Sequence, residues 1–176
     1  MEYGQQMQQA RENAKLAFYQ NPGYQLERRE RKIMILDVTI GIGTSFSTTL
    51  HEPLLIDRQS DIFLDSFTTF NALKNITSDP SAAPAHMSFL MGIDEFNIQS
   101  NSSNSNSFNR IIIPNNAADN SKAITHKTKK FNYICSINPG KLSQINGTIT
   151  NLADPPVTSF ASDGRFIAEF MIVARD

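Results

Sequence analysis

The stretch Arg165-Phe-Ile-Ala-Glu-Phe-Met-Ile-Val-Ala-Arg-Asp176 decides the fold class, because its side chains alternate as they do in a β-strand. One face carries Phe166, Ala168, Phe170, Ile172 and Ala174, and the other carries Ile167, Glu169, Met171, Val173 and Arg175. Both faces are apolar in the middle, which predicts a strand inside a sheet rather than at a solvated edge. We therefore expect an all-β domain in which one face of this strand meets the core. The other face is expected to meet an N-terminal arm, residues 1–31, or a neighbouring subunit.

Seven further strand-like runs precede this stretch, separated by loops rich in Asn, Ser, Gly and Pro. They are Lys32–Gly41, Thr44–Leu50 with Leu54–Ile56, Asp61–Phe70, His86–Phe96, Asn109–Pro114, Lys130–Ile137 and Ile145–Leu152. After residue 32 no helical pattern of useful length separates two runs, which favours a sandwich or barrel of eight strands over a βαβ fold. Pro53 predicts a bend or an edge position in the second run.

The apolar residues of these runs predict the core. Strict alternation over Asp61–Phe70 places Ile62 and Leu64 on one face and Phe63 and Phe67 on the other. Gly41-Ile-Gly43 has no third glycine and no helix after it, which predicts a turn or bulge rather than a phosphate-binding loop. We expect much of the core to consist of Ile35, Val38, Phe63, Phe67, Phe89, Ile112, Ile134, Ile149, Phe166 and Phe170.

Residues 1–31 differ in character from the domain predicted over residues 32–176. Gln5–Gln20 has the composition of a short helix that Asn21-Pro-Gly23 ends, with an apolar face formed by Met7, Ala10, Ala14, Ala17 and Phe18. Alone, this arm has too little apolar surface to stay folded in water, so it packs on its own domain or is ordered by a neighbouring subunit. Leu26–Lys32 is either a solvated linker, which its two glutamates favour, or a contact for an acidic or nucleic-acid partner.

Composition limits the possible partners and compartments. A chain of 176 residues predicts one domain with a substantial core, and its net charge of −1 argues against nucleic acid as a partner. The single cysteine, Cys135, excludes an internal disulfide and fits a reducing compartment or assembly in the cytoplasm. The polar start at Met1–Gln6 lacks the plan of a signal peptide, and the apolar runs are too short to span a membrane.

Two polar segments are predicted to be loops. Gln99–Ser107 is uncharged and of low complexity, so we expect an exposed loop that is a plain connector or, in an assembly, faces outward or reaches a neighbour. Asn115–Thr128 contains Lys122, His126 and Lys127, but no aromatic residues lie between its basic residues as they do in proteins that bind single-stranded nucleic acid. It is therefore predicted to be a solvated loop.

The residues that could carry chemistry are scattered. His51, His86 and His126 belong to different segments, so no metal site is expected. Cys135 lies among apolar strand residues, which is typical of a buried thiol rather than a nucleophile. Asp61 and Asp65 share one side of their predicted strand roughly 13 Å apart, too far to share a proton or a calcium ion. We therefore expect no catalytic, cofactor-binding or metal-binding residues and no enzymatic activity.

Two passages resemble a known family. Ile145-Asn-Gly-Thr-Ile-Thr-Asn-Leu-Ala-Asp154, followed by Phe160–Val173, resembles the end of small jelly-roll structural proteins of large double-stranded DNA viruses. The run His51-Glu-Pro-Leu-Leu-Ile-Asp-Arg-Gln-Ser-Asp-Ile-Phe-Leu-Asp-Ser-Phe67 is similar to a part of the same proteins. What is shared is a polar turn followed by a strand with an aspartate shortly before an aromatic residue. The likeness covers a minor part of residues 32–176 and includes no catalytic motif.

This resemblance implies an eight-stranded jelly-roll β-sandwich that serves as a penton or minor capsid protein of an icosahedral shell. It implies no site residues, because the function of such proteins lies in their surfaces. The implied partners are copies of the chain itself, with a pentamer favoured, and other capsid proteins including the major capsid protein. The implied location is the virion, assembled in the host cytoplasm. The alternative is a ligand- or carbohydrate-binding β-sandwich module, which the lack of Trp and the position of most Phe residues in strand runs disfavour.

Overall fold

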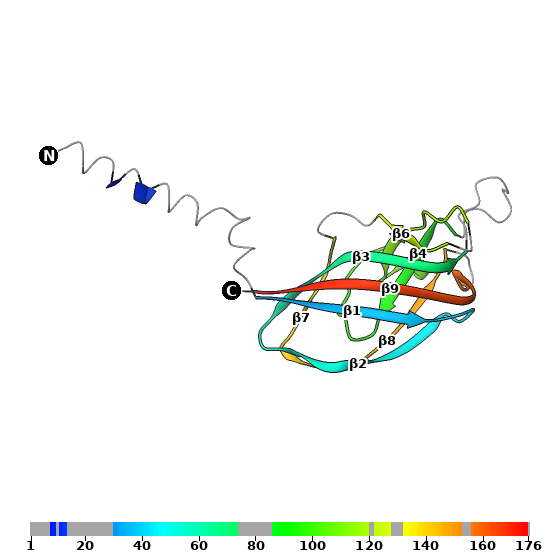
Figure 1. Cartoon of the computed structure of the whole chain (residues 1–176), viewed down its shortest axis with the longest axis horizontal. Helices are drawn as coiled ribbons and strands as arrows, with labels where there is room; N and C mark the ends of the chain where they lie inside the picture. Colours follow the sequence, from blue (N-terminus) through cyan, green and yellow to red (C-terminus); the bar gives the residue numbers. More distant parts are fainter. Residues whose placement is uncertain are drawn as a thin grey trace.

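Strands account for most of the residues that the structure, a computed structural model, describes. These residues are 8–9, 11–13, 30–73, 86–119, 122–127, 132–152 and 156–175. Among them lie nine strands and the short 3-10 helix η2 at Ser105–Ser107 (Figure 1). The strands are β1 (Arg31–Thr39), β2 (Ser45–Ile56), β3 (Ser60–Ala72), β4 (Ser88–Ile93), β5 (Ile111–Pro114), β6 (Ile124–His126), β7 (Asn132–Ile137), β8 (Gly140–Thr150) and β9 (Phe160–Ala174).

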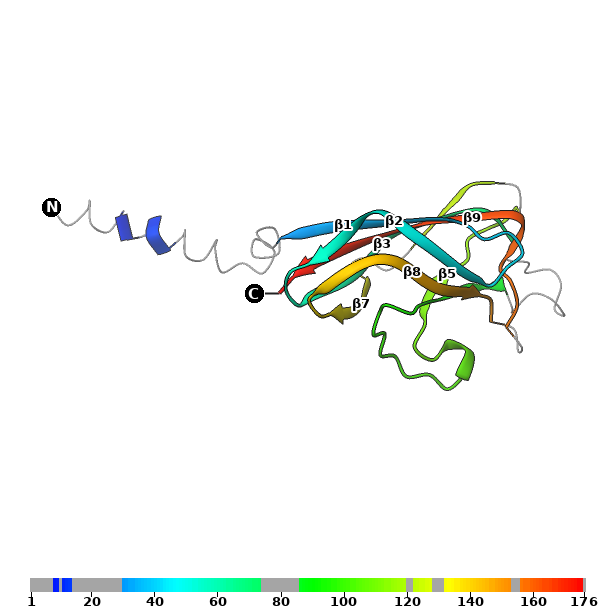
Figure 2. The ribbon, with the colours of Figure 1, turned by 90° about the horizontal axis from the view of Figure 1, so that it is seen from below.

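The strands form two antiparallel sheets, which confirms the prediction of an all-β sandwich. The first sheet has the order β1-β9-β3-β6, with β7 also paired with β3, and the second has the order β2-β8-β4-β5. The two sheets pack against each other (Figure 2), and side chains from both form one buried cluster. The described residues hold one strand more than the eight predicted, because β6 lies inside the segment predicted to be a loop.

The last strand of the structure, β9, lies inside its sheet, as its alternation predicts. It pairs with β1 along one side, from Arg165 to Val173, and with β3 along the other. Its inward residues Phe166, Ala168, Phe170 and Ile172 are each at most 1% exposed. β9 therefore forms the middle of the layer that the first sheet contributes to the core.

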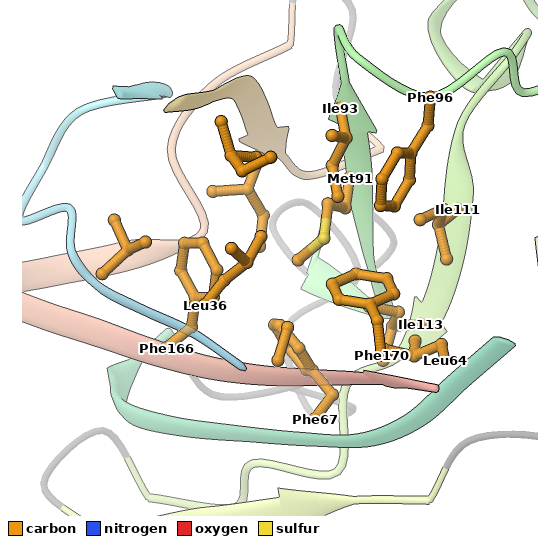
Figure 3. Close-up of a cluster of buried hydrophobic side chains, with 14 of the residues drawn as sticks. Leu36, Leu64, Phe67, Met91, Ile93, Phe96, Ile111, Ile113, Phe166 and Phe170 are labelled. Carbon is orange, nitrogen blue, oxygen red and sulfur yellow. The ribbon is translucent and has the colours of Figure 1, made fainter. Parts of the chain in front are cut away.

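The core lies between the two sheets and is rich in aromatic rings (Figure 3). The rings of Phe67 on β3 and Phe89 on β4 have centroids 5.3 Å apart, and Phe96 meets Phe170 edge to face at 5.4 Å. Such pairs add about 0.5–1.5 kcal/mol each beyond the burial of their surface. They join the first sheet to β4 and to the turn after it, so the two layers depend on each other.

Most of the predicted core is confirmed. Ile134 packs against the buried cluster, and six predicted residues are at most 6% exposed: Val38, Phe67, Phe89, Ile149, Phe166 and Phe170. The prediction is wrong for Ile35 and Ile112, which are 57% and 54% exposed, and Phe63 is only partly buried.

The errors at Ile35 and Ile112 concern which face of a strand points inward. In β1 the inward residues are Met34, Leu36 and Val38, while Ile35 shares the outer face with Asp37. The opposite choice would bury the Asp37 carboxylate, which is costly unless it is fully paired. In β5 three isoleucines follow one another, and a period of two allows only the first and third to point inward.

The error at Phe63 has a different cause, a β-bulge at Asp65. Leu64 pairs with Phe170 and Ser66 pairs with Glu169, so β3 has one residue more than β9 at this point. Ile62, Leu64 and Phe67 therefore share the inner face although their spacing breaks the alternation. A bulge depends on pairing between distant strands, so alternation within one strand does not reveal it.

Three local predictions concern the turn at Gly41 and Gly43, the edge position of Pro53 and the helix in the arm. Gly41 and Gly43 form the predicted turn between β1 and β2, where Gly41 has a φ of +57° that glycine adopts without strain. Pro53 lies inside β2 and near a register shift, and β2 is an edge strand, which confirms the edge position. Of the predicted arm helix, Gln8, Gln9 and residues 11–13 are helical and exposed, and the other residues lie outside the described ranges.

The two predicted loops differ in outcome. Gln99–Ser107 is largely exposed, as predicted, and is organised locally by Asn104, whose side chain accepts a hydrogen bond from the Asn106 N–H at 2.8 Å. The prediction of a solvated loop at Asn115–Thr128 is wrong, because Asn115 and His126 are only 3% and 2% exposed. This segment carries β6 and part of a buried polar network.

The core position of Phe170 yields a matched test. Phe170→Ala should lower the free energy of unfolding by about 3–5 kcal/mol, because it removes a fully buried ring and leaves a cavity. Phe70→Ala is the control, since Phe70 lies on the neighbouring strand but is 44% exposed. It should cost less than about 1 kcal/mol. Chemical denaturation measures both, and equal losses would contradict the assigned core.

Candidate interaction surface

Of the three histidines, His51 lies apart from the other two, while His86 and His126 lie near each other. His51 is exposed on β2. His86 and His126 come together at one end of the sandwich through neighbouring asparagines. The Asn115 side chain donates to the His86 carbonyl oxygen at 2.9 Å, and the Asn116 N–H donates to His126 Nδ1 at 3.0 Å. Within the described ranges, no group of three His, Cys, Asp or Glu side chains could hold a metal ion.

Asn115 is the centre of this buried network. Its side-chain nitrogen also donates to the Leu73 carbonyl oxygen at 2.7 Å, and its side-chain oxygen accepts the Ala117 N–H at 2.9 Å. One amide thereby joins the segment after β3, the segment before β4 and the segment after β5. Buried polar groups whose hydrogen bonds are made in this way fix the segments that they join.

His126 is held as a neutral side chain. Its Nδ1 accepts a hydrogen bond from Asn116, so the proton lies on Nε2, which contacts Thr69 Oγ1 at 2.6 Å. Burial lowers the pKa of His126 to about 4, and a hydrogen bond with the backbone of Pro114 partly opposes this shift. Protonation would break the Asn116 contact and place a charge beside the ring of Phe89, whose centroid is 4.9 Å away.

Two further predictions concern Cys135 and the aspartates. Cys135 is 3% exposed, which confirms the prediction of a buried thiol, and burial raises the pKa of this thiol to about 11. Asp61 accepts hydrogen bonds from Arg175 Nε and Ser136 Oγ, both at 2.8 Å. Asp65 is the exposed residue of the β3 bulge. Asp61 therefore belongs to a polar cluster formed with β7 and the residue after β9.

The outer side of the first sheet carries a row of apolar side chains across four strands. Ile33 on β1 is opposite Met171 on β9, Met171 is opposite Phe63 on β3, and Phe63 is opposite Tyr133 on β7. Ile33 and Tyr133, at the two ends of the row, are 61% and 51% exposed. The rings of Phe63 and Tyr133 meet edge to face, with centroids 5.8 Å apart. The row is exposed at both ends and partly buried in the middle, at Phe63 and Met171. Contiguous apolar patches on a surface are typical of contact sites.

Further apolar residues extend this row, and one carboxylate, that of Glu169, lies among them. Ile35 and Ile167 are 57% and 37% exposed on the same side of the sheet. Glu169 lies opposite Ile35 and accepts a hydrogen bond from Ser66 at 3.2 Å. We call this surface the outer apolar face and define it by Ile33, Ile35, Phe63, Tyr133, Ile167 and Met171.

One end of the outer apolar face opens into a hollow of about 380 Å³ between β3, β9 and the start of β6. Phe70, Ala123, Arg165 and Ile167 are among its lining residues. The guanidinium of Arg165 pairs with both carboxylate oxygens of Asp37, which lowers the pKa of that carboxyl. The hollow is thus apolar on one side and bordered by an ion pair on the other.

Exposed apolar side chains also lie on other sides of the sandwich. Ile42 in the β1–β2 turn is 72% exposed, and Leu55 on β2 and Ile112 on β5 are 55% and 54% exposed. Phe108, after the helix η2, is 51% exposed. These residues belong to the turn at one end, to the second sheet and to a loop, so exposed apolar residues are distributed around the sandwich.

The sequence predicts that one apolar side of β9 lies outside the core. It does not reveal the row of apolar side chains across β1, β9, β3 and β7 to which this side contributes. One signal was present in β1, where Asp37 and Thr39 share a side with Ile33 and Ile35 and so mark that side as solvent-facing. The contribution of β3 could not be found in this way, because the bulge at Asp65 moves Phe63 to the outer side.

Comparison with known proteins gives no match to a family model, to a curated protein or to a solved structure. Among the described residues, no helix is long and apolar enough to cross a membrane.

The neutral state of His126 predicts a specific dependence of stability on pH. Its pKa is about 4 in the folded protein and near 6.5 in the unfolded chain, so its contribution to stability is complete above pH 6.5. The contribution is lost as the pH falls from 6.5 towards 4. Between pH 7.5 and 4.5 the parent protein should lose about 2–3 kcal/mol more stability than a His126→Asn variant, which cannot titrate at this position.

Urea denaturation at the two pH values measures this difference. Thr49→Asn, at an exposed position of β2 that carries no titrating group, is the control, and it should keep the pH dependence of the parent protein. Equal pH dependence in the parent and in His126→Asn would contradict a neutral, buried His126.

Proposed function

We propose that the sandwich is a jelly roll and that the chain is a structural subunit of the capsid of a large icosahedral double-stranded DNA virus. The observation that carries the proposal is the nested order of the strand pairs. β1 pairs with β9, β2 with β8, β3 with both β6 and β7, and β4 with β5. Each pair encloses the next along the chain, as in one long hairpin rolled into two sheets. This order is typical of jelly rolls, a fold shared by viral capsid proteins, lectins and cupins, and the resemblance described above favours the capsid proteins among them.

The two short strands β6 and β7 are consistent with this interpretation. Both pair with β3, β6 near the end of β3 at Thr69 and β7 near its start at Ser60. Counted as two parts of one strand, they give eight strands in two sheets of four. The resemblance of residues 51–67, 145–154 and 160–173 to capsid jelly-roll proteins supports the same fold.

The distribution of exposed apolar residues supports a role in assembly. A shell subunit has neighbours on several sides, and each contact needs apolar surface that is exposed in the isolated subunit. Ile42, Leu55, Ile112 and the outer apolar face lie on different parts of the sandwich. A protein that binds a single small ligand would need only one such site.

Within the shell, we place the chain at the five-fold vertex as a penton, with another minor capsid position as the second choice. A penton closes through head-to-tail contacts between different patches of identical subunits, and apolar residues on several sides suit such contacts. The net charge of −1 keeps repulsion between packed copies small. The proposed partners are other copies of the chain and the major capsid protein. The proposed role is non-enzymatic and is exercised in the virion, after assembly in the host cytoplasm.

Light scattering coupled to size-exclusion chromatography tests the proposed ring. The full chain should form a species of about five times 19.7 kDa. Ile42→Asp and Ile112→Asp should shift it towards monomer without changing the thermal unfolding of the subunit, because both residues are exposed. Thr49→Asp, on an exposed position of β2, is the matched control and should leave the ring intact.

Electron microscopy of the source particle complements this measurement and should place the chain at the vertices. A protein that stays monomeric at high concentration and is absent from the particle would exclude the capsid role. A different number of copies, found within the particle, would exclude only the penton position.

A further inference from the structure

We propose that copies of the chain associate head to tail, with the outer apolar face of one copy against the outer side of the second sheet of the next, joined by an ion pair between Glu169 and Arg110. The proposal rests on the self-association that the proposed function requires, and it names the two surfaces that make the contact. Its starting point is two half-buried charges of opposite sign on opposite sides of the sandwich.

Arg110 lies over the outer side of the second sheet. Met91 and Ile93 on β4 belong to the buried core, so Gly92 between them faces outward. A Cβ atom at Gly92 would collide with Arg110 Nη1, so the missing side chain leaves the place that the guanidinium occupies. The same nitrogen donates to Thr148 Oγ1 on the neighbouring strand β8. The sequence thus holds a cation flat against the second sheet.

The chain before β5 fixes the position of this cation. Asn109 has a φ of +53°, in the left-handed region that few residues other than glycine adopt. Its side chain accepts a hydrogen bond from the Ser100 N–H at 3.0 Å, which closes the base of the loop that ends at Arg110. The guanidinium is therefore in place before a partner arrives, which lowers the entropy cost of a contact.

Arg110 and Glu169 both lack an ion pair within the part of the subunit that the structure describes. Glu169 accepts a hydrogen bond from the neutral Ser66 hydroxyl at 3.2 Å. The other half-buried cations of that part, Lys32 and Arg175, each pair with a carboxylate. A charge that is partly withdrawn from water without a counter-charge costs free energy, and a partner of opposite charge offsets this cost.

The two charges cannot meet within one subunit. Glu169 points to the outer side of β9, because its neighbours Ala168 and Phe170 are buried in the core. The inward residues of both sheets share one core, so the outer sides point away from each other (Figure 2). Packed sheets lie about 10 Å apart, and side chains fill the space between them. Glu169 can therefore reach an Arg110 only in a second copy.

Exposed apolar residues accompany both charges. On the first sheet, Glu169 lies opposite Ile35 on β1 and shares the outer side of β9 with Ile167. On the second sheet, Ile112 on β5 follows Arg110 by two residues and is 54% exposed. The two steps along the strand, from 169 to 167 and from 110 to 112, are both about 7 Å. An ion pair and an apolar contact can therefore form together.

The two surfaces thus complement each other in charge and in apolar character. Complementarity of charge fixes the orientation of a contact and rejects wrong pairings. Pairing of two outer apolar faces would instead leave Arg110 uncovered and bring two Glu169 carboxylates to one surface. Because the two surfaces differ, the contact is head to tail, and its repetition closes a ring where the rotation between copies allows closure.

Charge exchange in the full-length protein tests the contact. Glu169→Arg and Arg110→Glu should each weaken self-association about tenfold or more in sedimentation velocity, because each places like charges together. The double variant restores the pair with its charges exchanged and should recover most of the parent affinity. Glu52→Arg combined with Arg58→Glu, at two exposed positions that belong to neither surface, is the matched control and should associate like the parent protein.

Cross-linking tests the same contact without altering its charges. One variant carries Ile35→Cys and a second carries Ile112→Cys, while the native Cys135 is buried. When the two variants are mixed, a short bifunctional thiol reagent should join position 35 of one copy to position 112 of another. Links between two like positions should be rare, because the contact joins unlike surfaces.

The outcomes separate this contact from the proposed ring. A parent oligomer whose affinity neither charge reversal changes, or which cross-links only between like positions, would overturn the contact and leave the ring in place. A parent protein that stays monomeric at high concentration would overturn both. If a charge reversal lowers the thermal stability of the subunit, the cross-linking result decides alone.

Discussion

The fold depends on the position of β9 between β1 and β3. This strand provides backbone partners to both neighbours, and among the strands that the structure describes β1 is connected to the rest of its sheet only through β9. Its inward residues Phe166 and Phe170 contact rings from the opposite side of the core, Phe46 and Phe96. Loss of β9 would therefore detach β1 and open the core at once, which makes the sandwich cooperative.

The pairing of β9 also determines what the molecule exposes. Because successive side chains point to opposite faces, burial of Phe166, Ala168, Phe170 and Ile172 forces Ile167, Glu169 and Met171 outward. The same rule applied to β1 exposes Ile33 and Ile35. The outer apolar face is thus a consequence of the register that builds the core.

The sequence was sufficient for properties that depend on one segment at a time. The central position of β9, the turn at Gly41 and Gly43, the edge position of Pro53 and the burial of Cys135 follow from local composition and alternation. The bulge at Asp65 could not be predicted, because it arises from pairing between β3 and β9, which are about a hundred residues apart in the chain. The same holds for His126, whose polar partners Thr69 and Asn116 come from β3 and from the segment after β5.

Native-state hydrogen exchange of the β9 backbone amides is the most direct test of this account. The amides that bond β9 to β1 and β3 should exchange only through global unfolding, with a free energy of opening equal to that measured by denaturation. Amides near Pro53 in the edge strand β2 should open more readily. Exchange of the β9 amides through local opening, well below the global free energy, would contradict the central role of this strand.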